Sequence, residues 1–351
     1  MPAYRPGKGA AQAEAEHGIT GAIKLASNEN PLPPIPAILD AVNRAAAGAN
    51  RYADHRATAV RERLSEHLGV GADSITVGAG SVGLLQQIFL SYVDPGDEVV
   101  YPWRSFEVYP VYTLLMNGRA TTTPLTADHA FDLDAIASAV NEDTKLLVLA
   151  TPNNPSGTAL STAEMGRLLE GISTRTIVVI DEAYREFLDP ALGDPVTDLV
   201  PNHPNVVVTR TFSKAQGLAG LRAGYAIGHP DVIVNIDKTL FPFAVNGLAQ
   251  AAAIAAIDHR AEIDARVAAI LDERSRIVQT LTERGWTLPD AQANFVYLPI
   301  GEPTDHVYLE LERRGVVTRP FSNEGIRVTI STPEENDRFL GALAEVYSPA
   351  G

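Results

Sequence analysis

From residue 75 onward, short apolar runs alternate with segments that have helical spacing, and glycine or polar side chains follow the end of most runs. This alternation predicts an α/β architecture, in which helices cover a mostly parallel sheet. In such sheets a ligand binds in the crevice at the carboxyl ends of the strands. The runs expected to form strands are 75–77, 98–101, 145–150, 176–180, 205–209 and 223–227.

The run 205–209 leads into the segment 211–222, TFSKAQGLAGLR, which carries the strongest chemical signal. Lysine is rare in this chain and occurs only at positions 8, 24, 145, 214 and 238. Lys214 follows a buried strand beside hydroxyls and glycines, so it is a candidate Schiff-base amine, because burial and a neighbouring cation lower a lysine pKa. Arg222 is then placed to hold a phosphate. The alternative is a solvated Lys214 with a structural Arg222.

Two other strand ends favour an anion site and a buried acid. Gly80 and Ser81 follow a strand and begin a helix, and free N–H groups at a helix N-terminus bind anions. The sequence there is neither GxGxxG nor a Walker loop, so it gives little support for a nucleotide. Asp181 ends another strand, where a buried carboxylate needs a cationic partner. That partner is a protonated pyridine nitrogen or, alternatively, an arginine.

Together these residues fit pyridoxal phosphate, whose aldehyde needs Lys214 and whose ring nitrogen needs Asp181. With that nitrogen protonated, the ring takes up the electrons released at the substrate Cα, and the freed Lys214 amine moves the proton. We expect Asn154 and Tyr184 at the phenolic oxygen and Phe106 on the ring face. The residues expected around the phosphate and the rest of the cofactor are Gly80, Ser81, Thr211, Ser213 and Arg222.

After residue 242 the composition becomes helical over 246–284, as one long helix or two joined near residue 258, and three strands then follow. This pattern predicts a second, α+β domain. We expect an N-terminal arm at 1–34 that joins the small domain, a large cofactor-binding domain at 35–245 and the small domain at 246–351.

Several motifs resemble the fold-type I pyridoxal-phosphate aminotransferases, in particular the histidinol-phosphate aminotransferase subfamily. They are SNENP (27–31), PNNPSG (152–157), DEAY (181–184), FSKAQGLAGLR (212–222), NFV (294–296) and RVT (327–329). The resemblance implies a homodimer in which Tyr52 of each chain contacts the cofactor phosphate of the other. It also implies that Asn28 lies beside the substrate and that Arg327 binds its carboxylate, or a phosphate in histidinol-phosphate enzymes.

Within this subfamily, the segments 23–29, 103–110 and 318–321 are similar to actinobacterial aromatic amino acid aminotransferases. This version implies reversible transfer of the amino group of phenylalanine, tyrosine or tryptophan to 2-oxoglutarate. Trp103 and Phe106 would form an apolar wall, and Arg319 would assist in binding the substrate anion. The alternatives are a histidinol-phosphate aminotransferase, a decarboxylase on the same scaffold and a non-enzymatic regulator.

Composition limits the partners of the chain. A net charge of −15 argues against nucleic acid and anionic membranes, which require basic surfaces. The absence of cysteine removes disulfides and thiolate metal ligands. No apolar run is long enough to span a bilayer, and residues 1–20 read as a polar arm with little structure. We therefore expect a cytoplasmic protein that acts on small molecules and uses no metal, and the resemblance implies that it is a homodimer.

Overall fold

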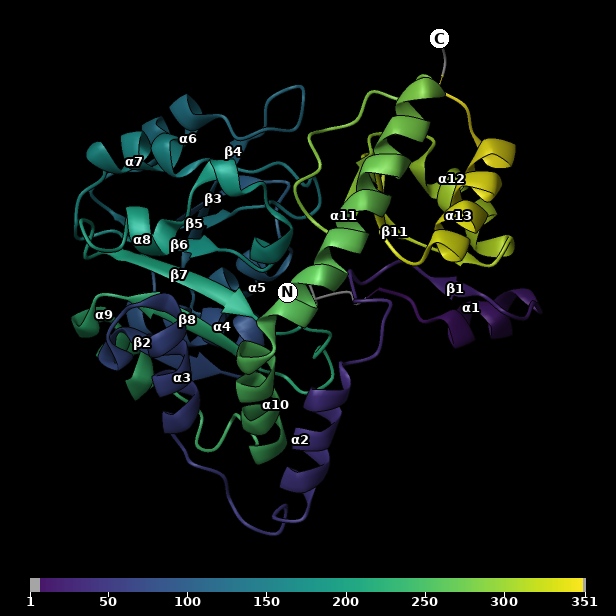
Figure 1. Ribbon diagram of the computed structural model, residues 1–351. Helices are drawn as coiled ribbons and strands as arrows, with labels where there is room; N and C mark the ends of the chain where they lie inside the picture. The colour runs from purple at the N-terminus through teal and green to yellow at the C-terminus, as the bar shows by residue number, and fades with distance from the viewer. Residues whose placement is uncertain (1–6, 350–351) are drawn as a thin grey trace.

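The computed structural model describes residues 7–349 and contains a central seven-stranded sheet (Figure 1). The strand order is β2-β8-β7-β6-β5-β3-β4, and only β8 runs antiparallel to its neighbours. The prediction of a mostly parallel sheet is therefore confirmed. The strands are β2 (Ile75–Gly78), β3 (Glu98–Trp103), β4 (Arg119–Pro124), β5 (Thr144–Ala150), β6 (Ile177–Asp181), β7 (Val206–Thr211) and β8 (Gly224–Gly228).

Helices cover both faces of this sheet, which explains why its inner strands are apolar on both sides. One face packs against α4 (Gly80–Tyr92), α5 (Val108–Leu115) and α9 (Pro230–Lys238). The other face packs against a second set of helices. That set is α3 (Thr58–Leu68), α6 (Leu133–Ala139), α7 (Thr162–Glu170), α8 (Pro195–Asp198) and α10 (Gly247–Asp258). Short 3-10 helices are η1 (Ala72–Ser74), η2 (Arg185–Phe187) and η3 (Pro190–Leu192).

The helical stretch after residue 245 forms two helices, α10 and α11 (Arg260–Glu283), which meet at His259. The alanine-rich α10 packs against α2 (Pro36–Ala46) and α3, so it stays with the large sheet. The long α11 then leads to the C-terminal part (Figure 1). Small alanine side chains let α10 pack closely on its neighbours. The domain boundary at residue 246 stays a prediction.

The C-terminal part contains an antiparallel sheet with strand order β11-β12-β9. Its strands are β9 (Phe295–Leu298), β11 (Arg319–Phe321) and β12 (Gly325–Thr329), and its helices are α12 (Thr304–Arg313) and α13 (Pro333–Val346). This is the α+β pattern expected from the sequence. In addition, β1 (Ile23–Lys24) pairs in parallel with β10 (Val316–Val317), which attaches the N-terminal segment to this part.

The N-terminal segment is more ordered than expected. The expectation of little structure for residues 1–20 is wrong for α1 (Ala10–His17), while residues 1–6 lie outside the described part. The helix ends at Gly18, whose φ of 64° is left-handed. The buried carboxylate of Glu312 in α12 pairs with Lys8 and lies 3.0 Å from Nε2 of His17. These contacts with a distant helix stabilise α1, and a local pattern does not reveal them.

Among the described helices, none combines the length and apolar character needed to cross a membrane.

Candidate active site

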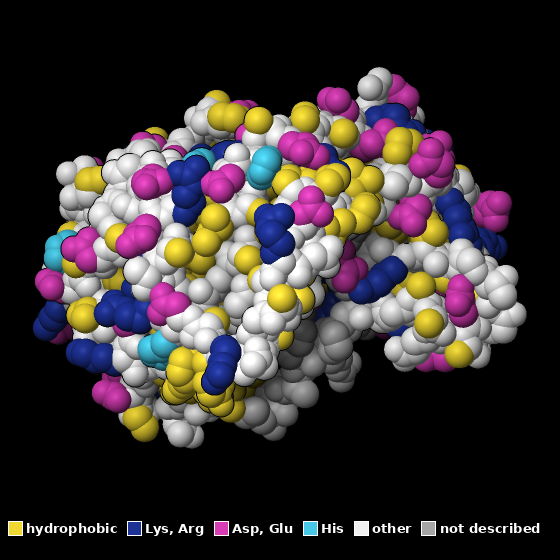
Figure 2. Space-filling model, turned by 60° about the horizontal axis from the view of Figure 1, so that its bottom comes forward, with side chains coloured by type: hydrophobic (Ala, Val, Ile, Leu, Met, Phe, Trp, Pro, Cys, Tyr) yellow, Lys and Arg dark blue, Asp and Glu magenta, His cyan; other side chains and the backbone are white. Residues whose placement is uncertain are grey.

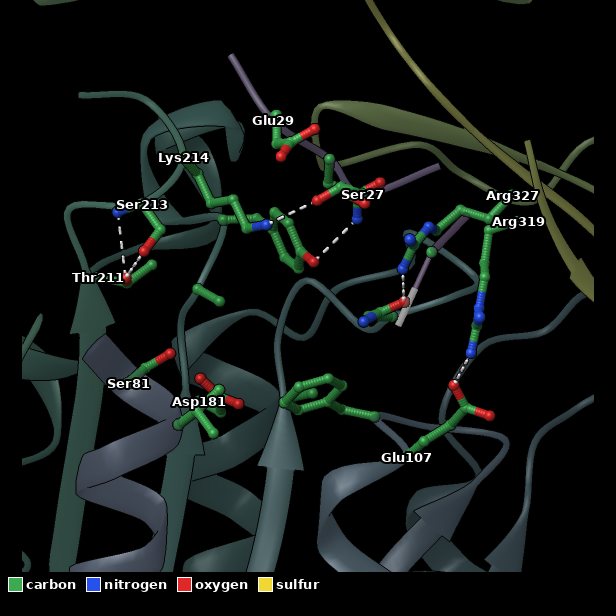
Figure 3. A pocket seen from close by; sticks show the side chains of 18 of the residues that line it. Ser27, Glu29, Ser81, Glu107, Asp181, Thr211, Ser213, Lys214, Arg319 and Arg327 are labelled. Carbon is green, nitrogen blue, oxygen red and sulfur yellow. Dashed lines mark hydrogen bonds and ion pairs between the residues drawn. The ribbon is translucent and has the colours of Figure 1, made fainter. Parts of the chain in front are cut away.

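A pocket opens at the carboxyl ends of β5, β6 and β7, where strands β11 and β12 of the C-terminal part approach the large sheet (Figure 3). Its empty space measures about 1080 Å³ with the open mouth included. This is the place where ligands bind in open α/β sheets. Of the residues predicted for the site, the structure brings together Asn28, Ser81, Phe106, Asn154, Asp181, Tyr184, Thr211, Ser213, Lys214, Arg222, Arg319 and Arg327.

Lys214 projects into the pocket from the loop that follows β7 (Figure 3). Its ammonium donates a hydrogen bond to the carbonyl oxygen of Ser27 at 3.0 Å and lies 5.7 Å from the ring centroid of Tyr184. Burial, and then the nearby Arg327 cation, lower the pKa of Lys214 to about 7. A large fraction of this amine is therefore neutral at physiological pH, which is the form that attacks a carbonyl.

Asp181 is the last residue of β6 and is only 3% exposed. Its carboxylate accepts hydrogen bonds from the hydroxyls of Tyr109, at 2.8 Å, and Thr209, at 3.0 Å. Burial raises the pKa of Asp181, and these two hydrogen bonds oppose the increase. Both donors are neutral, and within residues 7–349 no cation pairs with this carboxylate. The site therefore fits a ligand that supplies a positive charge, as a protonated pyridine nitrogen does.

A cup suited to phosphate lies where α4 begins. The guanidinium of Arg222 lies 3.3 Å from Oγ of Ser213 and 3.4 Å from the carbonyl oxygen of Ala79. Gly80 has a φ of +74°, and a Cβ at this position would lie 2.5 Å from Nη2 of Arg222. Only glycine therefore allows the guanidinium to approach the helix N-terminus this closely. A cation, free backbone N–H groups and the Ser81 hydroxyl together form an anion site.

Polar groups at the opposite wall are well placed for the substrate. Arg327 is 7% exposed and donates to Oδ1 of Asn154 at 2.5 Å and to the carbonyl oxygen of Ala26 at 2.7 Å. The amide of Asn28 donates to the phenol oxygen of Tyr184 at 2.9 Å. These contacts connect residues predicted for the substrate with residues predicted for the cofactor.

Gly80 contributes to the cup through its backbone, and two other predicted residues lie outside the pocket. Tyr52 is 83% exposed and stacks on Phe243, with ring centroids 4.5 Å apart. Trp103 lines a separate surface hollow, where the guanidinium of Arg104 lies 4.6 Å from its ring centroid and pairs with Glu324. Trp103 is therefore not among the residues that line this pocket, and its place in a substrate wall stays a prediction. The ring of Trp103 packs against the guanidinium of Arg104.

Sequence reasoning also missed two residues. Tyr109 was not assigned a role, although it lies three positions beyond Phe106, on the first turn of α5. Glu107, which lines the pocket and pairs with Arg319, was not assigned a role.

The ends of the parallel strands thus bring together three features: a half-buried lysine of lowered pKa, a buried carboxylate and a phosphate cup. This combination defines a pyridoxal-phosphate enzyme. Residues 20–343 match the family model for aminotransferase class I and II, and the chain belongs to this family. Enzymes of this family depend on pyridoxal phosphate, and the residues described above fit that cofactor.

Relatives with similar sequences cover nearly the whole chain. The aromatic amino acid aminotransferase of Streptomyces avermitilis is 46% identical over 341 residues, which are 97% of this chain and 93% of the relative. That of Streptomyces coelicolor is 45% identical over 345 residues, or 98% and 95% of the two chains. Among solved structures, histidinol-phosphate aminotransferase from Sinorhizobium meliloti in complex with pyridoxal-5′-phosphate superposes with a TM-score of 0.90. It shares 30% identity, and the match covers 97% of this chain and 95% of that one.

Proposed function

We propose that this aminotransferase transfers the amino group of phenylalanine, tyrosine or tryptophan to 2-oxoglutarate, reversibly and in two half-reactions. The observation that carries the proposal is a single pocket lined by a buried arginine, Arg327, and by the aromatic side chains of Phe106 and Phe321. An arginine binds the carboxylate of an amino acid, and aromatic rings pack against an aromatic side chain. The names of the Streptomyces relatives support the same substrate class.

Each residue has a distinct part in the proposed reaction. When bound, pyridoxal phosphate supplies the electron sink for the bond that breaks at the substrate Cα. Asp181 holds the proton on the ring nitrogen, since its buried carboxylate has only neutral donors around it in the described residues. The Lys214 amine takes the proton from Cα, because its lowered pKa leaves it unprotonated often enough to act as a base. Arg327 fixes the carboxylate and thereby orients the Cα–H bond.

We further propose a cytoplasmic homodimer in which Tyr52 contacts the cofactor phosphate of the partner. Exposed aromatic side chains at Tyr52 (83%), Phe241 (74%) and Phe243 (42%) support an interface, because such groups seldom gather on a solvent-facing surface. Figure 2 shows hydrophobic side chains gathered in patches among charges of both signs on one face. A dimer mass in solution and weaker cofactor binding by Tyr52→Phe would support this arrangement, and a monomer with full activity would contradict it.

The second candidate is histidinol phosphate as amino donor, which the structural match to the Sinorhizobium meliloti enzyme favours. Steady-state rates with 2-oxoglutarate and each donor separate the two. The proposal predicts a higher kcat/KM for phenylalanine, tyrosine or tryptophan than for histidinol phosphate, and the reverse order would overturn it.

A further inference from the structure

Asn28 is held from two sides by the C-terminal part of the chain. It is 1% exposed, and its φ of 53° is left-handed, a conformation that asparagine adopts more readily than most non-glycine residues. The backbone N–H of Asn28 donates a hydrogen bond to Oγ1 of Thr329, the last residue of β12, at 2.9 Å. Its carbonyl oxygen accepts from Nδ2 of Asn294, directly before β9, at 3.1 Å. These two contacts fix the backbone of Asn28.

The hydroxyl of Thr329 also orients the side-chain amide of Asn28. Because Oγ1 accepts the backbone N–H of Asn28, the hydroxyl proton is directed to another acceptor, and Oδ1 of Asn28 lies 3.1 Å away. An asparagine amide has one end that accepts and one end that donates. With Oδ1 turned towards Thr329, Nδ2 is left to donate to the phenol oxygen of Tyr184 at 2.9 Å. One hydroxyl thus determines which end of the amide meets Tyr184.

This orientation affects Tyr184, which is buried and lines the pocket. The phenol oxygen of Tyr184 accepts from Asn28, so the phenol proton is directed to a different acceptor. Hydrogen bonds in a chain polarise one another, so the bond from Asn28 makes the phenol a stronger donor. A reversed amide would instead present Oδ1 to the phenol and would accept the phenol proton itself.

Thr329 lies one step behind the residues that line the pocket. Asn28 and Tyr184 both line it, whereas Thr329 is buried and is not among the lining residues. Thr329 therefore acts on a bound cofactor through its hydrogen bonds to Asn28 rather than by contact. All three residues are buried, so water competes little for the hydrogen bonds that connect them.

We propose that Thr329 is a positioning residue for the cofactor. Its hydroxyl orients the Asn28 amide so that the Tyr184 phenol donates to the phenolic oxygen of bound pyridoxal phosphate. A hydrogen bond at that oxygen stabilises negative charge there, so it lowers the pH at which the bound cofactor loses a proton. The inference rests on the expected place of Tyr184 beside this oxygen, which the test checks separately. It holds for any amino donor, because it concerns the cofactor alone.

The test is a pH titration of the visible absorption band of the bound cofactor, without any substrate. Thr329→Val removes the hydroxyl at nearly constant volume, and Thr329→Ser keeps it. We expect the midpoint to rise by at least about half a pH unit in Thr329→Val, because the phenol becomes a weaker donor. The midpoint in Thr329→Ser should equal that of the wild type. A role in packing alone would predict the opposite order, since serine lacks the methyl group that valine keeps.

Further variants check each step of the chain of hydrogen bonds. Tyr184→Phe and Asn28→Ala should both raise the midpoint. Adding Thr329→Val to Asn28→Ala should raise it no further, because Thr329 acts through an amide that is already lost. A further rise in the double variant would show that Thr329 acts by another route and would overturn the inference.

Thr318→Val is the matched control. Thr318 is a buried threonine directly before β11, and its hydroxyl makes no hydrogen bond within residues 7–349. An equal shift in Thr318→Val, or an unchanged midpoint in Thr329→Val, would contradict the proposed role. Should Thr329→Val fail to load cofactor, Thr329→Ala removes the same hydroxyl and is judged by the same titration.

The titrations also separate the role of Thr329 from the place of Tyr184. If Tyr184→Phe leaves the midpoint unchanged, Tyr184 does not face the phenolic oxygen, and the inference fails with that placement. If Tyr184→Phe raises the midpoint and Thr329→Val does not, only the role of Thr329 fails. The choice of amino donor is decided separately, by the rates with phenylalanine and histidinol phosphate.

Discussion

The phenol of Tyr109 donates a hydrogen bond to Oδ2 of Asp181 at 2.8 Å. Thr209 donates to the other carboxylate oxygen, so two neutral groups hold the acid that would face the ring nitrogen. Both hydrogen bonds lower the pKa of Asp181 against the increase caused by burial. Tyr109 thus helps to keep this carboxylate ionised where desolvation favours the neutral acid.

Tyr109→Phe should therefore raise the pKa of Asp181. A hydrogen bond to a charged group contributes ~1.5–3 kcal/mol, so the acid limb of the kcat/KM profile should move to higher pH by about one to two units. Activity is then lost sooner as the pH falls. Tyr112→Phe is the control, because the Tyr112 hydroxyl donates to the carbonyl oxygen of Val82 instead. An unchanged profile in Tyr109→Phe would contradict this role.

The lowered pKa of Lys214 predicts how the cofactor-free protein reacts with pyridoxal phosphate. Only the neutral amine attacks the aldehyde, so the attachment rate should rise with pH and reach its half-maximum near pH 7, the value of about 7 that burial and Arg327 give this lysine. Stopped-flow absorbance after mixing measures this rate. Arg327→Gln should move the midpoint upward, because a cation that lowers the lysine pKa is lost. A midpoint above about pH 9, close to that of an ordinary lysine, would refute the assignment.

The lowered pKa of Lys214 also affects how the stability of the folded protein depends on pH. Between pH 7 and the ordinary lysine range, the unfolded chain holds a proton on Lys214 that the folded chain has released. The free energy of unfolding of the cofactor-free protein should therefore increase with pH in this window. Lys214→Met should lack this component, and denaturant titrations of both proteins at pH 7 and pH 9 give the comparison. An equal pH dependence in the two proteins would contradict the shift.

Gly80→Ala tests the phosphate cup. The new methyl group would lie 2.5 Å from Nη2 of Arg222 at a backbone φ of +74°, so the guanidinium or the helix start must move. We expect the dissociation constant of pyridoxal phosphate to rise at least about tenfold, a loss of ~1.4 kcal/mol. Gly220→Ala lies in the loop that leads to Arg222, where a Cβ has nothing within 4 Å. Equal cofactor affinity in the two variants would argue against the cup.

The two aromatic residues 103 and 106 should behave differently. Phe106 lines the pocket, and Trp103 lines a separate hollow under Arg104. Phe106→Ala should raise KM for phenylalanine several-fold, because a buried aromatic contact of ~1 kcal/mol is lost. Trp103→Ala should have no selective effect on aromatic donors. A selective rise in KM for Trp103→Ala would instead support its predicted place in the substrate wall.

The sequence predicted the central sheet well, because strands buried on both faces appear as continuous apolar runs. The strand β6 differs from its expected bounds by one residue at each end. By contrast, β4 has the sequence RATTTP, lies at the sheet edge and is mostly exposed, so it shows no apolar run. The helix α1 was missed because its contacts with Glu312 come from a segment about three hundred positions away.

Some residues of the site could likewise be predicted from the sequence, and others could not. Asp181 ends a buried strand and Lys214 follows one, while Ser81 begins a helix directly after a strand. Local sequence therefore places these three residues at the crevice, and they could be predicted. Tyr109 and Glu107 contact partners 72 and 212 positions away, which a local pattern does not indicate. Trp103 shows a further limit, since its position in the sequence did not indicate that its side chain lines a separate hollow.

The most direct test of the proposed function is a single half-reaction on the purified, cofactor-loaded protein without any keto acid. Phenylalanine and histidinol phosphate are added separately, and loss of the visible absorption band of the bound cofactor is followed. We expect rapid loss with phenylalanine and a poor response to histidinol phosphate. Rapid loss with histidinol phosphate alone would contradict the aromatic assignment, and a wild-type protein that holds the cofactor without a visible band would contradict the role of Lys214.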